Sequence, residues 1–461
     1  MRIIFGQEKR SKAKTRTRGS IEALLLMVEW HSRAIHFPPA ADGWDSSLLL
    51  TDDDPRDDRL GNRADTADEI NVAWFREIVT PAKTSDRMSW MLLGCAQSLA
   101  LELGLCEVKP ATGIPSSADP RSPNQETRLS ELLYIAIEQH SSRLGCLSML
   151  PGGLSRVLSE PSRSHDETGI MPAWLNLTNL LKAINDILFP SSDGTKELLK
   201  SGRYVTAVKH FRQQLQTWRI AYLDAGNLPM HYQVELSIEY SHIRAFMNSL
   251  GIQALVDRVL GNPGANPAGP EIFELCITAT DYEFIKEVID GSCQTLDSVN
   301  RLSEAGTLRY CPVRVFLRVI TASILLLKAL SLGTRETELE ASLAVLDRCV
   351  HALKASTLDE MHLAVRYGSL LEAHLSKFRQ GMVPSAPPRD ISSFQGFGGW
   401  DSGGLGVLNG DTLDEFSFSA SNWLALPLDR SMAPFAPWSD SADMADLEDR
   451  SWDILWSLPN V

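Results

Sequence analysis

The sequence lacks closely spaced cysteines. Its seven cysteines are scattered over 461 residues, and no two of them are closer than eleven positions. A zinc site in a sequence needs thiolates two to four residues apart, so that one turn directs both at the metal. The spacing gives no zinc cluster within these residues, and the odd, dispersed set is typical of reduced intracellular thiols. We therefore expect neither a metal nor a cofactor in this chain.

An uninterrupted hydrophobic run is also missing, and the N-terminus has no apolar core of a signal peptide. The most apolar stretch, Val315 to Gly333, contains Arg318 and Lys328. Each charge costs about 2.5–3.5 kcal/mol at the centre of a bilayer. The stretch therefore predicts a buried helix of a large helical domain, and we expect no association with a membrane.

Strand-type alternation of useful length and internal repeats of fixed period are absent as well. From Thr127 onward, apolar residues recur at the three- and four-residue steps of helices, which predicts an all-α fold. Two such faces comprise Val208, Phe211, Leu215, Trp218 and Tyr222, and Ile285, Val288, Ile289, Leu296 and Val299. A third, narrower stripe predicts packing against one partner helix; it comprises Leu339, Leu343, Leu346, Val350 and Leu353.

Charge and composition divide the chain into three parts. Residues 1–20 predict a basic flexible arm, 21–383 a large helical domain, and 384–461 a tail. Within the domain, residues 42–69 form a predicted acidic loop, and the proline-rich residues 107–126 form a predicted linker. The net charge of −14 argues against a chain that coats nucleic acid with its whole surface.

The basic arm is the one part of the sequence that suits phosphate contacts. Besides Arg2, it carries a run of six cations against the single acid Glu8: Lys9, Arg10, Lys12, Lys14, Arg16 and Arg18. Such a run is a solvated tail, a nuclear-import signal or an arm that contacts phosphates.

The tail has few basic residues and many acidic and aromatic ones. Three arginines stand against twelve acids, and ten aromatic residues are interspersed among the acids. Proline, glycine and charge oppose a packed core, so we expect a disordered acidic activation region that offers its rings to coactivators and the transcription machinery. The alternative is that the rings fold back onto the helical domain. At the extreme C-terminus, one face of a short helix would carry Leu447, Trp452, Leu455 and Trp456.

Catalytic motifs are weak. The stretch "DDPRD", Asp53 to Asp57, matches the DDxxD pattern with which helical prenyl and terpene synthases bind Mg²⁺. Pro55 lies inside it, and the nearest second metal motif has Phe189 where a hydroxyl ligand belongs. Nucleophile elbows, H-E-x-x-H pairs and phosphate loops are also missing. We therefore do not expect an enzyme, and an Mg²⁺-dependent synthase is a remote alternative.

Two helical stretches carry a resemblance to a known family. The helix expected over Ser89 to Leu105 has apolar and small residues at Met91, Leu92, Cys95, Leu99 and Leu103, and it ends at Gly104. With the stretch that follows it, it resembles the middle homology region of fungal Zn₂Cys₆ transcription regulators. The first block comprises Trp90, Gly94, Ala96, Leu99, Ala100, Glu102, Leu103, Gly104 and Leu105. The second comprises Arg128, Leu132, Tyr134, Arg143, Leu144, Gly145 and Pro151.

Further stretches, Ala23 to Pro39 and Asp42 to Asp45 among them, look like the branch that regulates catabolism of aromatic amino acids. The resemblance implies a nuclear regulator of RNA polymerase II transcription that responds to a small-molecule effector and forms a homodimer. It also implies an N-terminal cluster of six cysteines with two zinc ions, and none of those cysteines is in this sequence. Zinc is therefore expected only in the missing cluster, and DNA contact only through that module or through an intact partner.

Two interpretations compete within this resemblance. In the first, the chain is a zinc-cluster-type regulator without its DNA-binding module, and its helical domain restrains the activation tail. In the second, it is an interaction protein that does not bind DNA and competes with an intact homologue for partners.

Overall fold

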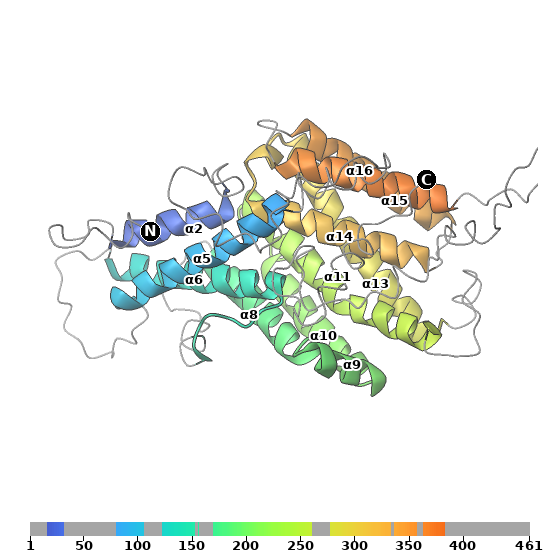
Figure 1. The fold of residues 1–461 in the computed structure, drawn as a ribbon, viewed down its shortest axis with the longest axis horizontal. Coiled ribbons are helices and arrows are strands. Elements are labelled where there is room, and N and C mark those ends of the chain that lie inside the picture. Colours follow the sequence, from blue (N-terminus) through green and yellow to red (C-terminus); the bar gives the residue numbers. More distant parts are fainter. Residues whose placement is uncertain are drawn as a thin grey trace, which may run out of the picture.

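The computed structural model describes residues 16–31, 80–105, 122–152, 155, 169–260, 277–332, 336–356 and 363–382. These residues form eleven α-helices and one 3-10 helix, with no strand among them, which confirms the all-α prediction (Figure 1). In chain order the elements are α2 (Arg18–Glu29), α5 (Thr80–Glu102), α6 (Ser122–Leu144), α8 (Ile170–Leu188), α9 (Ser192–Lys200), α10 (Tyr204–Tyr222), α11 (Met230–Leu260), α13 (Ala279–Glu304), η3 (Leu308–Tyr310), α14 (Val313–Ser331), α15 (Glu336–Ala355) and α16 (Leu363–Met382).

Three apolar cores hold the helices together. The first joins α2, α5 and α6 to one side of α8, and the second joins α8, α9 and α10 to α11. The third and largest joins α11, α13, α14, α15 and α16. Because α8 and α11 each contribute to two cores, they connect the parts of the domain into one body. Figure 1 shows α11 and α13 in the middle of it, between α10 and α14.

The close approach of α11 and α13 depends on two glycines. A β-carbon placed on Gly251 would lie 2.4 Å from the Phe284 ring, and one on Gly291 would lie 2.9 Å from the carbonyl oxygen of Ser241. Both distances are shorter than real side chains tolerate, so these positions bring the two helix backbones together. At its start, α13 is fixed by a capping box in which Thr278 and Asp281 satisfy each other's backbone N–H groups.

The predicted apolar faces of α10 and α13 are confirmed. On α10, Val208, Phe211, Leu215 and Trp218 are buried, and Tyr222 packs at the edge of the second core. The five predicted positions of α13 are all buried in the third core. The narrow stripe of α15 differs from expectation, because α15 packs against both α13 and α16 rather than against one partner helix.

The apolar stretch from 315 to 333 is the buried helix α14, as predicted. Its Arg318 and Lys328 are 2% and 4% exposed, so the helix carries both charges into the core. No helix among the described residues is long and apolar enough to cross a membrane.

The end of α5 is confirmed and its buried face is corrected. Gly104 has φ +69°, and the N–H of Leu105 donates to the carbonyl of Ala100, which closes the helix as a left-handed cap does. Of the apolar positions that the helical spacing selected, Leu92 and Leu99 are buried, but Met91 and Leu103 are both 37% exposed. The buried residues are Met88, Leu92, Leu93, Ala96, Leu99 and Ala100. The core face is therefore rotated, because α5 carries apolar residues on several sides.

Some predicted boundaries fall inside helices. The helix α2 begins at Arg18, within the predicted basic arm, and α6 begins at Ser122, within the predicted linker. The last described helix ends at Met382, one residue before the predicted end of the helical domain. The acidic loop 42–69, with its DDxxD match, and the tail 384–461 lie outside the described residues.

Candidate functional site

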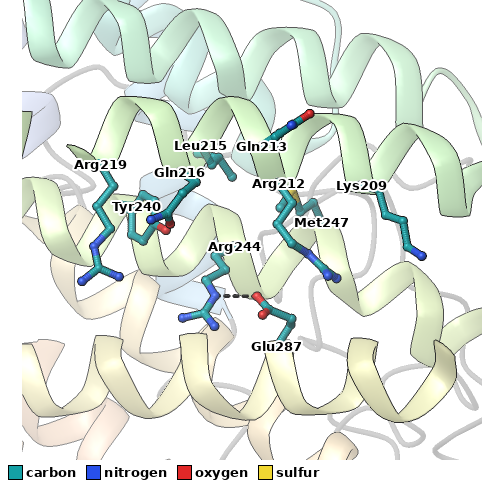
Figure 2. A pocket seen from close by; sticks show the side chains of 10 residues that line it. All are labelled: Lys209, Arg212, Gln213, Leu215, Gln216, Arg219, Tyr240, Arg244, Met247 and Glu287. Carbon is teal, nitrogen blue, oxygen red and sulfur yellow. Dashed lines mark hydrogen bonds and ion pairs between the residues drawn. The ribbon is translucent and has the colours of Figure 1, made fainter. Parts of the chain in front are cut away.

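One face of α11 forms the floor of a groove on the surface of the domain. Two contiguous hollows of about 340 and 590 Å³ share Arg219 and Tyr240, with α10 on one side and α13 on the other (Figure 2). The floor residues recur at three- and four-residue steps: Met230, Gln233, Val234, Ser237, Tyr240, Ser241, Arg244 and Met247. We call this feature the α11 groove.

The groove exists because α11 packs on two sides and leaves a strip between them. Leu236, Ile243 and Leu250 enter the second core, which includes α10. Ile238 and Ala245 enter the third core, which includes α13. The helices α10 and α13 lie on either side of α11 and run antiparallel to it. Their side chains line the groove along its length. The wall residues are Lys209, Arg212, Gln213, Leu215, Gln216, Leu223 and Asp224 from α10 and the turn after it, and Glu287, Gln294, Asp297, Ser298 and Arg301 from α13.

Cations dominate the lining of the groove. Five basic side chains line it against three carboxylates; the cations are Lys209, Arg212, Arg219, Arg244 and Arg301, and the carboxylates are Asp224, Glu287 and Asp297. Figure 2 shows Lys209, Arg212 and Arg219 projecting from α10 toward the side of the groove that α13 forms. Among the described residues, no acid forms an ion pair with Lys209. The lining therefore suits an acidic partner.

Arg244 is fixed in the floor. Its Nε lies 2.6 Å from Glu287 Oε2, its Nη2 lies 3.6 Å from Asp290, and its Nη1 donates to Gln294 at 3.3 Å. Burial opposes its charge, but the hydrogen bond to Glu287 and the carboxylate charges outweigh burial and raise the pKa of Arg244. Arg244 therefore remains charged and joins α11 to α13.

The α10 arginines are held less tightly. Arg212 forms an ion pair with Glu283 across the groove and donates to Asn248 Oδ1 at 2.6 Å. Arg219 lies over the Tyr240 ring, 6.0 Å from its centroid, and pairs with Asp224 at 3.4 Å. The side chains of Glu283, Arg219 and Asp224 are all more than 40% exposed, and pairs of this kind contribute at most about 1 kcal/mol each. An incoming carboxylate can replace these partners at little cost.

A second polar cluster lies partly buried where α2, α8, α11 and α14 meet. Arg314 pairs with Glu29 and with Glu235, and its guanidinium lies 4.7 Å from the centroid of the Trp174 indole. Burial raises the pKa of Glu29, although the charge of Arg314 opposes the shift. The hollow beside this cluster has a volume of only about 40 Å³, enough for a few water molecules but not for a metabolite. We therefore regard the cluster as structural.

The two sequence blocks of the resemblance pack against each other. Arg143 of the second block forms a buried ion pair at 2.7 Å with Asp86, which lies on the same helix as the first block. Trp90 stacks on His140, with ring centroids 6.0 Å apart. The hydroxyl of Tyr134 donates to Asn179 Oδ1 at 2.8 Å and ties α6 to α8. These residues build the first core and its polar edge.

The structure describes two of the residues predicted to contact phosphates. Arg16 forms an ion pair with Glu102 at 2.8 Å, and Arg18 forms one with Glu126, so both cations have acidic partners on the domain. Lys9, Arg10, Lys12 and Lys14 lie outside the described residues, as do Leu447, Trp452, Leu455 and Trp456. The described residues contain no group of three side chains able to hold a metal ion.

The comparisons with known proteins give one informative match. The chain is 38% identical to "Transcription factor hmgR" of Aspergillus fumigatus, over an alignment of 498 positions that includes all of the chain and 65% of that protein. The chain is a homologue of a fungal transcription factor. It spans somewhat less than two thirds of the length of this relative. No protein-family model and no solved structure matches the chain.

Sequence reasoning did not find the α11 groove. One signal was readable: Arg212 and Arg219 border the apolar stripe of α10 on one side, and Lys209 lies farther round on that same side. The remaining lining comes from α11 and α13, and only the packing of the three helices brings these residues together.

Proposed function

We propose that the chain is the regulatory and activation part of a fungal transcription regulator of the Zn₂Cys₆ type. The observation that carries the proposal is the similarity to a fungal transcription factor along the whole chain. The two packed blocks on α5 and α6 support the zinc-cluster type, because they match the middle homology region. In this proposal the protein acts in the nucleus on RNA polymerase II genes, among them genes of amino-acid catabolism.

DNA contact is assigned to a zinc-cluster module or an intact partner, because the cysteines of this sequence are too widely spaced to form such a cluster. The tail, residues 384–461, is assigned to activation through its acids and aromatic rings. The helical domain is assigned to restraint of that tail. A homodimer and a small-molecule effector agree with the proposal, and no enzymatic activity is part of it.

The experiment is a reporter assay with residues 384–461 fused to an unrelated DNA-binding domain. We expect clear activation from the fusion. Trp452→Ala with Trp456→Ala should remove most of it, because buried aromatic residues dominate such interfaces. Trp400→Ala with Trp423→Ala is the matched control and should retain most of the signal. An inert fusion, or a double substitution at 452 and 456 without effect, would contradict the activation role.

The full chain in the same fusion separates the two interpretations of the family resemblance. A regulator should give activation that the helical domain reduces relative to the tail alone. An interaction protein that competes with an intact homologue should be inert as a fusion, and it should lower the output of the homologue when both are expressed.

A further inference from the structure

We propose that the α11 groove binds the chain's own C-terminal segment, residues 446–458, as a short helix. The proposal rests on the activation role proposed for the tail and adds the surface that restrains it. In the docked state the rings of Trp452 and Trp456 contact the groove and are withheld from coactivators.

The shape of the groove suits a helix. Its floor runs along one face of α11 from Met230 to Met247, a length of about 26 Å at 1.5 Å per residue. Residues 446–458 would span about 20 Å as a helix, and Pro459 follows at its end. A short amphipathic helix between two flanking helices is a common mode of peptide recognition.

The charges of the two partners are complementary. Residues 446–458 contain Asp446, Glu448, Asp449 and Asp453 against the single cation Arg450. The groove is lined by five cations and three carboxylates, and Glu283 and Asp290 beside it pair with Arg212 and Arg244. Lys209 and Arg219 are the cations most free to accept an acidic partner, because Lys209 has no ion pair among the described residues and the partner of Arg219 is half exposed. Such a contact weakens as salt rises.

One end of the groove also offers an exposed apolar side chain to the rings. In a helix, Trp452, Leu455 and Trp456 lie at i, i+3 and i+4 and share a face. At the end of the groove Met230 is 81% exposed, whereas Tyr240 and Met247 in the floor are buried, so the exposed apolar contact for the rings lies at Met230. Methionine adapts its shape to aromatic partners, and an exposed methionine at the end of a groove is suited to receive one.

Chain length permits the contact. The last described helix ends at Met382, and the 63 residues between it and Asp446 can span up to about 200 Å when extended. The linker is therefore long enough for the segment to reach the groove of its own chain. The high local concentration of a tethered segment favours the chain's own tail over that of a second copy.

The direct test places a photo-crosslinking phenylalanine analogue at position 452 in the full chain. We expect the crosslinks within one chain to map to peptides of α10, α11 or α13 that contain groove residues, and their yield to fall at high salt. The same analogue at Trp400 is the control and should not label these peptides. Crosslinks that map to other helices, or that join two chains, would overturn the assignment.

A second test measures transcription output from the full chain fused to an unrelated DNA-binding domain. Lys209→Glu with Arg219→Glu should raise the output at least threefold, because the reversed charges repel the acidic segment. Lys354→Glu with Arg379→Glu reverses two cations of similar exposure on α15 and α16 and should leave the output unchanged. Deleting residues 446–461 from the Lys209→Glu, Arg219→Glu variant should abolish the gain; a gain that survives the deletion would contradict the proposal.

The two proposals fail in different ways. If residues 384–461 are inert as an isolated fusion, the activation role fails, whereas the crosslink at position 452 still reports whether the segment docks. If the isolated tail activates but the crosslink avoids the groove, the activation role stands and the docking site is wrong.

Discussion

Arg318 of α14 and Glu239 of α11 form an ion pair at 2.9 Å in which both side chains are less than 5% exposed. The Arg318 Nη1 also lies 3.1 Å from the Nε2 of His242. Two charged groups in the core lose their hydration, and their mutual attraction and hydrogen bonds compensate only while both are present. The pair therefore fixes how α11 and α14 meet.

Removing one member of this pair should destabilise the domain strongly. We expect Arg318→Met to lower the free energy of unfolding by about 3–5 kcal/mol, because it leaves Glu239 buried without its partner. The double variant Arg318→Met, Glu239→Met should recover much of that loss. Urea denaturation followed by circular dichroism measures both values; a single variant as stable as the parent would show that water reaches Glu239.

Replacing Lys328 by an apolar residue should stabilise the domain. It is 4% exposed, and burial lowers its pKa to about 8 from 10.5. At neutral pH the folded state therefore holds a proton on a buried amine, which costs up to about 3 kcal/mol. Lys328→Met should raise the free energy of unfolding by about 1–3 kcal/mol.

The pH dependence of stability tests whether the buried charge of Lys328 is the reason for this stabilisation. Between pH 8 and 10.5 the unfolded chain keeps the Lys328 proton and the folded chain loses it, so the stability of the parent should rise with pH. Lys328→Met should lack that rise. An unchanged slope in the variant would assign the rise to other groups.

The sequence was sufficient for the fold class and for helices with one clear apolar face. On α10 the face from Val208 to Trp218 is buried as the spacing predicts, because polar residues occupy the rest of the helix. On α5 the same reasoning selected Met91 and Leu103, which are exposed. Its apolar residues surround the helix, and only contact with α2 and α6 decides which of them are covered.

The glycine at the contact of α11 with α13 should tolerate no side chain. Gly251→Ala should cost about 1–3 kcal/mol, because its β-carbon would lie 2.4 Å from the buried Phe284 ring. Gly94→Ala is the matched control, since its nearest neighbour, the Met149 sulfur, lies at an ordinary 3.7 Å. That control should be neutral or stabilising by up to about 1 kcal/mol through helix propensity. Thermal unfolding of the two variants measures this difference, and a Gly251→Ala variant as stable as Gly94→Ala would contradict the prediction.

The candidate site was less predictable than the fold. The cations of α10 are visible in the sequence, but Tyr240, Arg244 and Glu287 lie 20 or more residues away along the chain. Their approach depends on the tight α11–α13 contact and on the antiparallel run of α10. A groove between three helices is a property of packing, and no local spacing encodes it.

Acid should destabilise the domain through His242. Burial, together with the charge of Arg318, lowers the pKa of His242 well below 6.5. As pH falls below 6.5, His242 binds a proton in the unfolded chain but remains neutral in the folded chain. The free energy of unfolding therefore decreases. Glu29 acts in the opposite direction, because its raised pKa makes the folded state take up a proton more readily.

His242→Gln should therefore flatten the decline in stability between about pH 6.5 and 5, while the amide keeps a hydrogen-bond acceptor for Arg318. Urea denaturation at a series of pH values gives the slope. His210→Gln, at an exposed position of α10, is the control and should follow the parent. A slope in His242→Gln as steep as that of the parent would rule out His242 as its source.

DNA binding by this chain should be weak and non-specific, with a salt dependence set by the basic arm. Arg16 and Arg18 are paired with Glu102 and Glu126, which leaves Lys9, Arg10, Lys12 and Lys14 for phosphates. Four phosphate contacts predict a slope of about −3.6 in a plot of log binding constant against log salt concentration, whereas six predict about −5.4.

Glu102→Gln with Glu126→Gln should release both arginines and make the slope steeper, toward the value for six contacts. Fluorescence anisotropy with unrelated duplexes measures the slopes, and a preference for one duplex at physiological salt would contradict the assignment of sequence-specific DNA contact to another module.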